Sequence, residues 1–150
     1  MDRAAEDRIE LRALIDTYGV LVDQREFDRV AGLFVPDGLL TTSVGPPAVG
    51  RRAIATSLES ALAWFADRHG LVGKLVTQHL MANHVCELRG VTATGVVYAT
   101  ARLGGPGGAS PRAVINVLRY EDRYERVGAQ WRLRSRGIVR LWSEEARLTG

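Results

Sequence analysis

The chain has 150 residues, of which 46% are hydrophobic and 25% charged, so its length and composition are typical of one globular domain over residues 1–150. The single cysteine, Cys86, excludes an internal disulfide and suits a reducing compartment, so we expect a cytoplasmic protein. The amino terminus lacks the apolar stretch of a signal peptide, and no run of about eighteen apolar residues predicts a membrane span.

The positive charge of the chain is almost entirely arginine. The net charge is +3, Lys74 is the only lysine, and seven arginines fall between Arg119 and Arg140. A nucleic-acid surface needs basic residues clustered on one face, preferably with aromatic residues among them. Here acidic residues interrupt the run and the arginines alternate with apolar residues, which favours the solvated faces of strands. We therefore expect neither a nucleic-acid partner nor a membrane partner.

The first half of the chain has mainly helical periodicity. Residues 4–25 predict an amphipathic helix, because apolar residues recur on one side and charged residues fill the other. A short second helix is predicted at residues 26–34, before a proline and an Asp-Gly turn, and a third over residues 51–69. Between these helices, residues 39–44 predict a short strand and residues 45–50 a loop.

The second half of the chain is rich in β-branched and aromatic residues. Four long antiparallel strands joined by hairpins are predicted over residues 74–90, 91–104, 112–128 and 129–142. The glycine-rich residues 104–111 are predicted to be a hairpin tip. Helices followed by a meander of strands indicate an α+β fold, and a long four-stranded sheet curls strongly. Helices on one face of such a sheet would enclose a pocket for a small ligand.

Three segments carry a resemblance to a known family. They are "IDTYGVLVDQREFDRVAGLFVPDG", "VTQHLMANHVCE" and "YEDRYERVGAQWRLRSRGIV". Together they resemble the SnoaL-like branch of the NTF2-like superfamily over nearly the whole chain. The resemblance implies an NTF2-like cone, in which a curved antiparallel β-sheet wraps around helices as an α+β barrel, and a site inside the cone. It also implies a homo-oligomer, either a dimer or a trimer.

The resemblance also implies site residues. In the scytalone dehydratase and bile-acid dehydratase members, a tyrosine, an aspartate five residues later and a strand histidine perform acid–base elimination. The matching residues are Tyr18, Asp23 and His79. The second strand histidine of scytalone dehydratase has no match, and Tyr98 lies in that region instead. The base of the ketosteroid isomerases falls at about Thr42, which cannot serve as that base, so their mechanism is not carried over.

His79 and His84 pose a question of orientation. On a regular strand His79 shares one face with Asn83, while His84 lies on the opposite face with Cys86, unless a bulge intervenes. One of the two rings can then line the pocket. The resemblance favours His79, for which the sequence alone indicates a hydrogen-bonded core histidine, and we expect His84 to be structural. Two histidines that face apart make a poor metal pair, and no phosphate-binding or dinucleotide-binding motif is present, so we expect no metal and no cofactor.

The remaining candidates are weaker. Asp23 lies near the carboxyl end of the first helix, where the helix dipole disfavours a carboxylate, which indicates either solvation or a purpose. For Tyr18, packing at the edge of the core is as plausible as donation to a substrate oxygen. Five further residues are candidates for substrate binding, with a place in the core or on a strand surface as the alternative: Asn83, Tyr98, Trp64, Asn116 and Arg140.

These residues predict a cofactor-independent acid–base enzyme. His79 would remove the proton α to a carbonyl of a polycyclic or polyketide-like molecule, Asp23 would orient His79, and Tyr18 would donate to the enolate oxygen. Dehydration, isomerisation and cyclisation share this first step, so all three remain open. The alternative is a small-molecule-binding or oligomeric assembly module without catalysis. Contact between Asp23 and His79 in an open pocket would favour the enzyme.

Overall fold

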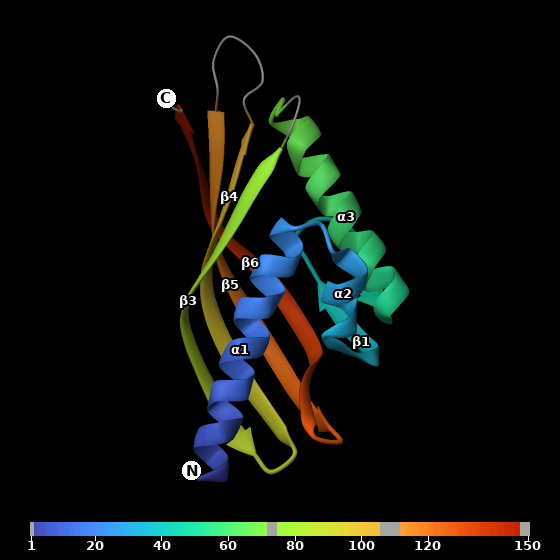
Figure 1. Cartoon of the computed structure of the whole chain (residues 1–150). Coiled ribbons are helices and arrows are strands. Elements are labelled where there is room, and N and C mark those ends of the chain that lie inside the picture. Colours follow the sequence, from blue (N-terminus) through green and yellow to red (C-terminus); the bar gives the residue numbers. More distant parts are fainter. Residues whose placement is uncertain (1, 72–74, 106–111, 148–150) are drawn as a thin grey trace.

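A strongly curved sheet with helices against one side makes up the computed structural model of the chain, which describes residues 2–71, 75–105 and 112–147 (Figure 1). In chain order the described elements are α1 (Arg3–Asp23), α2 (Phe27–Gly32), β1 (Phe34–Thr41), β2 (Ala48–Val49), α3 (Arg51–Arg68), β3 (Val76–Arg89), β4 (Thr92–Gly105), β5 (Arg112–Val127) and β6 (Gln130–Arg147). The predicted α+β fold with three helices and four long strands is confirmed. None of the described helices combines the length and apolar character needed to cross a membrane.

The six described strands form one sheet in the order β2-β1-β6-β5-β4-β3. Strand β1 runs parallel to β6, and every other neighbouring pair is antiparallel. The sheet does not close into a barrel, because β2 and β3 remain at its two edges. Helix α1 lies along β3, and α2 and α3 sit beside β1 at the other edge (Figure 1). The helices therefore lie against one face of the curved sheet, and the hydrophobic core lies between them.

Two predictions about the first half of the chain were wrong. The strand expected at residues 39–44 begins at Phe34, so β1 includes the Pro36-Asp37-Gly38 stretch that was predicted to be a turn. This stretch fits because the pairing of β1 with β6 shifts register between Phe34 and Leu39. The predicted loop at residues 45–50 contains the two-residue strand β2. Of the predicted hairpin tip at 104–111, Gly104 and Gly105 end β4, and residues 106–111 lie outside the described part.

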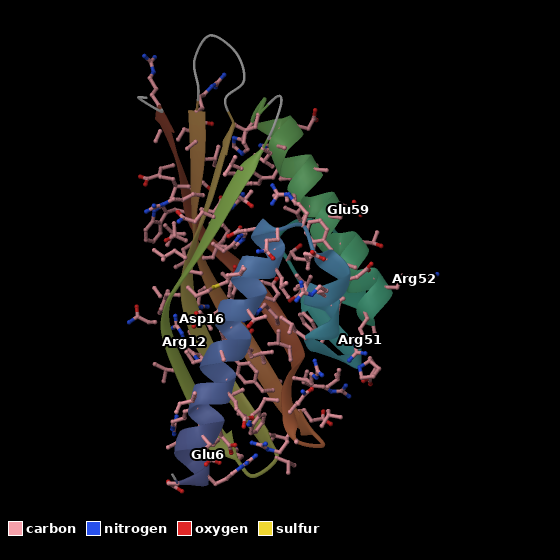
Figure 2. All side chains as sticks on the ribbon, viewed as in Figure 1. Glu6, Arg12, Asp16, Arg51, Arg52 and Glu59 are labelled. Atoms are coloured by element: carbon pink, nitrogen blue, oxygen red, sulfur yellow. The ribbon has the colours of Figure 1, made fainter. Side chains whose placement is uncertain are left out.

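A one-residue bulge in β3 changes which side chains face the helices. Met81 pairs with Ala99 and His84 with Val97, so β3 has one extra residue between these pairs. Arg12 of α1 holds the bulge by donating to the carbonyl oxygens of Met81 at 2.9 Å and Ala82 at 2.7 Å. Figure 2 shows Arg12 on the side of α1 toward β3. The prediction that His79 and His84 face opposite ways was therefore wrong: both lie on the helix side.

A buried ion pair crosses the inner side of the sheet. Arg136 of β6 donates to both carboxylate oxygens of Asp122 on β5, at 2.8 and 2.7 Å, and neither side chain is exposed. The guanidinium carbon lies 4.1 Å from the ring centroid of Tyr18 and 4.3 Å from that of Tyr120. The expectation that the arginines of this region face solvent was wrong for Arg136. Its charge is tolerated because the carboxylate and two aromatic faces replace water.

The ion pair continues into a hydrogen-bonded chain toward β3. The Tyr124 hydroxyl donates to Asp122 at 2.7 Å, and its oxygen lies 3.2 Å from Nε2 of His84. Burial lowers the pKa of His84, which favours the neutral ring. His84 therefore has the structural role that the sequence predicts. Gly95 makes room for this chain, because a Cβ at that position would lie 2.9 Å from the Tyr124 ring and 3.2 Å from His84 Nε2.

Asp122→Asn should destabilise the protein by about 3–5 kcal/mol, because it leaves the Arg136 charge buried without its partner. The free energy of unfolding from urea titrations measures this loss. The matched control is Asp37→Asn, which breaks an exposed arginine–carboxylate pair with Arg134 and should cost much less. Equal losses in the two variants would contradict the assigned importance of the buried pair.

Gly95→Ala should destabilise the protein by roughly 1–3 kcal/mol, because the added methyl displaces the rigid Tyr124 ring from its two hydrogen-bond partners. Gly32→Ala is the control, since a Cβ there meets nothing within 4 Å. Thermal unfolding of both variants measures the difference. A Gly95→Ala protein as stable as the Gly32→Ala protein would show that the close approach is unimportant.

Candidate active site

The end of α1 is tied to the start of β3. Arg25 follows the helix in a left-handed conformation, with φ of 63°. Its guanidinium donates to the Asp23 carbonyl oxygen at 3.0 Å, to the Leu75 carbonyl oxygen at 3.1 Å and to the Thr77 hydroxyl oxygen at 2.7 Å. These bonds join two segments that are about fifty residues apart in sequence, and they fix the turn from which the Asp23 side chain projects.

The Asp23 carboxylate accepts three hydrogen bonds from β3. One oxygen accepts the backbone N–H of His79 at 2.8 Å. The other lies 2.7 Å from Nδ1 of the His79 ring and accepts the Thr77 hydroxyl at 3.0 Å. Burial alone would raise the pKa of Asp23, but the hydrogen bonds from the His79 ring, the His79 backbone and Thr77 outweigh it and lower the pKa below its usual range. The group is therefore an anion when it meets His79.

This contact determines which nitrogen of His79 is available. Because a carboxylate only accepts, Nδ1 carries the proton that it donates to Asp23. In a neutral ring Nε2 is then an unprotonated acceptor. Both side chains are mostly buried, with exposed fractions of 12% for His79 and 21% for Asp23. The contact with Asp23 thus fixes the orientation of the His79 ring and leaves Nε2 as the nitrogen that can accept a proton.

Gly19 allows α1 to come close enough for this contact. A Cβ on Gly19 would lie 2.9 Å from the terminal carbon of Met81 and 3.4 Å from Cβ of His79. A larger side chain would push the helix away from β3, and Asp23 is on the next turn of the same helix. Gly19 is a residue that the sequence reasoning missed, and helical periodicity alone gave no signal for it.

A cavity of about 140 Å³ opens beside the His79 ring. Its wall is mostly apolar, with Leu58, Phe65, Leu103 and Leu118 among the lining residues, and it is bounded on one side by Thr42 and Ser43. Asn116 and Arg140 also line it. A small, mainly apolar hollow with a few convergent polar groups is the usual form of a small-molecule site.

Asn116 is the buried hydrogen-bond donor of this cavity. The residue is only 5% exposed, and its side-chain oxygen accepts the Ser143 hydroxyl at 2.6 Å. That contact assigns the amide nitrogen, and no described residue accepts a hydrogen bond from it. Arg140 lines the same cavity but is exposed, so it adds a positive charge at the open side. Asn116 and Arg140 are thus the two predicted substrate-binding residues that lie with His79.

Tyr18 does not line this cavity, so of its two predicted roles the structure favours packing in the core over donation to a substrate oxygen. Five helical residues turn the chain by about 500°, so the two side chains leave α1 in different directions. Tyr18 is 1% exposed and packs against Tyr120 and the Arg136 guanidinium. Burial raises its pKa, and the arginine offsets only part of that rise. The structure places Tyr18 in the core.

Three other candidates also lie away from the cavity. Asn83 is in the β3 bulge and is exposed, so it does not share the His79 face as predicted. Tyr98 is 44% exposed on the outer face of β4, since its neighbours Ala99 and Ala101 take the inner positions. Trp64 is 41% exposed and lines a separate groove on the adjacent side of α3. The position on β4 that pairs with His79 is Ala101, so no second histidine faces it there.

The described residues contain no group of three or more histidine, cysteine or carboxylate side chains arranged to hold a metal ion. His84 is held by Tyr124, and Cys86 lies next to Arg8, whose guanidinium donates to the Cys86 carbonyl oxygen at 2.8 Å. Both residues are on the helix side of β3, but neither lines the cavity.

Solved structures share this fold over almost the whole chain. A candidate scytalone dehydratase from Novosphingobium aromaticivorans aligns with a TM-score of 0.78 and 18% identity, over 97% of this chain and 91% of that one. A hexachlorocyclohexane dehydrochlorinase of type 2 aligns with a TM-score of 0.75 and 18% identity, over 98% and 92% of the two chains. An NTF2-like protein with a cystatin-like fold, also from Novosphingobium aromaticivorans, aligns with a TM-score of 0.67 and 27% identity, over 93% and 84%.

Among curated proteins no match is found. The sequence model of the SnoaL-like domain, however, matches residues 3–137, which include α1, the strand that carries His79, and most of the sheet. This chain therefore belongs to the SnoaL-like domain family.

Proposed function

We propose that the protein is a cofactor-independent acid–base enzyme that removes a proton next to a carbonyl group of a small molecule. The observation that carries the proposal is that His79 lines an open cavity while Asp23 binds its Nδ1 from behind the cavity wall, which leaves Nε2 as acceptor. A carboxylate held by three hydrogen bonds against an imidazole is the arrangement that orients a histidine for acid–base catalysis. The dehydratase and dehydrochlorinase with the same fold also support an elimination.

In the proposed reaction, Nε2 of His79 takes the proton on the carbon α to the carbonyl, and the electron pair of that C–H bond passes to the carbonyl oxygen. Asp23 stabilises the imidazolium that forms. The amide of Asn116, with the Arg140 charge at the open side, stabilises the enolate oxygen, the role first assigned to Tyr18. This reassignment follows from position, because Asn116 lines the cavity and Tyr18 does not.

The second step distinguishes dehydration from its alternatives. When the substrate carries a β-hydroxyl, the enolate forms the carbon–carbon double bond, the C–O bond breaks, and the leaving oxygen takes the proton from His79 to give water. With no second histidine at the Ala101 position, His79 serves as both base and acid. Isomerisation and cyclisation use the same enolate, and dehydration is favoured because the two named neighbours are eliminating enzymes.

His79→Gln should lower turnover by roughly 10²–10⁴-fold, because the amide cannot accept the proton. The probe is the water adduct of benzalacetone, whose elimination is followed by the rise in ultraviolet absorbance of the enone. His69→Gln is the control, since His69 lies at the end of α3, binds Glu145 and does not line the cavity. Equal rates in the two variants, with both folded by circular dichroism, would refute the role of His79.

If the wild-type protein does not turn over this probe, proton exchange provides the second measurement. Incorporation of deuterium from heavy water at the α carbon of acetophenone, followed by proton NMR, tests the first step alone. Wild-type exchange that His79→Gln abolishes supports the proposal. Exchange no faster than in buffer would overturn the proposed base.

Asp23→Asn should reduce turnover and also change how stability depends on pH. The folded-state pKa of Asp23 is below its unfolded value of about 3.9, so the carboxylate stabilises the fold above that pH and the stabilisation is lost as pH falls. Wild type should therefore be more stable than Asp23→Asn near neutral pH, and the gap should narrow below about pH 4. Urea titrations at several pH values measure the gap. A gap that is constant with pH would contradict the assignment.

A further inference from the structure

The inner cavity is too small for a polycyclic substrate. Its volume is about 140 Å³, whereas a cavity of about 150 Å³ holds one benzene molecule. A molecule that brings a carbonyl next to His79 can therefore place about one ring inside. Any larger part must lie outside this cavity.

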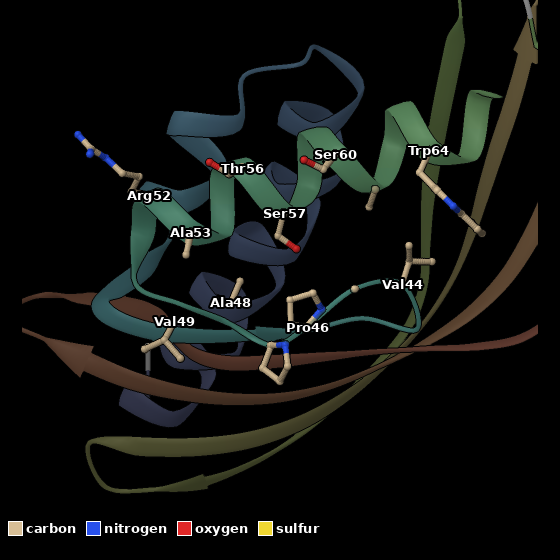
Figure 3. Close-up of a pocket in the computed structure, with 13 residues that line it drawn as sticks. Val44, Pro46, Ala48, Val49, Arg52, Ala53, Thr56, Ser57, Ser60 and Trp64 are labelled. Carbon is tan, nitrogen blue, oxygen red and sulfur yellow. The ribbon is translucent and has the colours of Figure 1, made fainter. Parts of the chain in front are cut away.

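A second, larger depression lies on the adjacent side of α3. This groove has a volume of about 810 Å³ and runs between α3 and the segment from Val44 to Val49 (Figure 3). Apolar groups form most of its wall, including Pro46, Pro47, Ala48 and Ala53. Val49 is 65% exposed and Trp64 41% exposed, so two large apolar side chains face the groove without being covered. No acidic residue lines it.

The groove and the cavity adjoin each other. Val44 and Ala61 line both of them. Along the chain, Thr42 and Ser43 belong to the cavity and the next residues belong to the groove. On α3, one side faces the cavity and the adjacent side faces the groove. Figure 3 shows Val44, one of the two shared residues, at the same end of the groove as Trp64.

We infer that the groove and the cavity are two compartments of one binding site, so that the substrate extends beyond the ring that carries its carbonyl group. The carbonyl-bearing ring occupies the cavity beside His79, and an apolar body extends past Val44 and Ala61 to rest against Trp64 and the two prolines. This inference rests on the proposed function for the position of the carbonyl. The groove contributes affinity through apolar burial, and its residues take no part in proton transfer.

The test compares two inert ketones, acetophenone and para-phenylacetophenone, whose dissociation constants are measured by NMR titration. In the wild type, the second ring should tighten binding roughly tenfold or more, because it buries an additional aromatic group. Ser57→Phe fills the middle of the groove and does not alter the cavity lining. This variant should bind the larger ketone no more tightly than acetophenone. Its affinity for acetophenone should stay within about twofold of wild type, because a substitution confined to the groove does not affect binding in the cavity.

Two further variants make the result decisive. Ala63→Phe is the matched control, since Ala63 is exposed on α3 but lines neither the groove nor the cavity, and it should behave as wild type. Ala53→Phe is the second groove variant in case Ser57→Phe fails to fold, because Ala53 is exposed. No advantage of the larger ketone in wild type, or an advantage that survives in the folded groove variant, would overturn the inference.

Sedimentation velocity distinguishes a ligand compartment from an interface between copies of the chain. The groove variants should sediment as wild type. A change in sedimentation coefficient with unchanged ketone affinities would assign the groove to self-association and overturn the inference. Because neither ketone carries a β-hydroxyl, these binding results are independent of turnover. Failure of His79→Gln to lower the elimination rate would refute the proposed function and leave the groove result standing.

Discussion

The bulge in β3 is the constraint on which both polar systems of the protein depend. A regular strand would send His79 and His84 to opposite faces, and only one of them could contact the helix side. The extra residue at Ala82–Asn83, held by Arg12 of α1, turns both rings inward. His79 then meets Asp23, and His84 meets Tyr124. Loss of the bulge would leave one of these systems without its histidine.

The two histidines show how environment separates function from structure. His84 lies at one end of a hydrogen-bonded chain, and the Arg136–Asp122 pair lies at the other. Within the described residues, the buried side-chain polar atoms of this chain all have a hydrogen-bond partner, except Nη1 of Arg136. His79 has one nitrogen committed to Asp23 and lies against a cavity. A satisfied network rigidifies the sheet, whereas an uncommitted acceptor beside a cavity is what the proposed base requires.

The buried network and the Asp23–His79 contact are linked through α1. Tyr18 packs on Arg136, and Gly19, the next residue of α1, contacts β3. The buried ion pair and the close helix–strand contact therefore determine where α1 ends, and the end of α1 carries Asp23. The site needs this support, because an Asp–His contact of 2.7 Å is lost if the helix moves by a fraction of a helical turn. The groove beside α3 lies outside this rigid part, which is consistent with a compartment that adds affinity and leaves the proton transfer unchanged.

The sequence by itself determined the α+β class, the three helices and the four long strands, because hydrophobic periodicity and turn residues are local signals. It also indicated Asp23 and His79, although through resemblance to a family and not through spacing.

Tertiary structure decided the rest. The bulge arises from pairing between β3 and β4, so Asn83 is on the outer face although it alternates correctly with His79. Arg136 is buried because Asp122 and two tyrosine rings meet it from other elements, which no window around residue 136 contains. Tyr18 and Trp64 do not line the cavity as predicted. The periodicity of a helix shows which residues share a side, but only the packing of that helix against its neighbours shows what each side faces. Local sequence determines which element a residue joins, whereas contacts between elements determine what that residue faces.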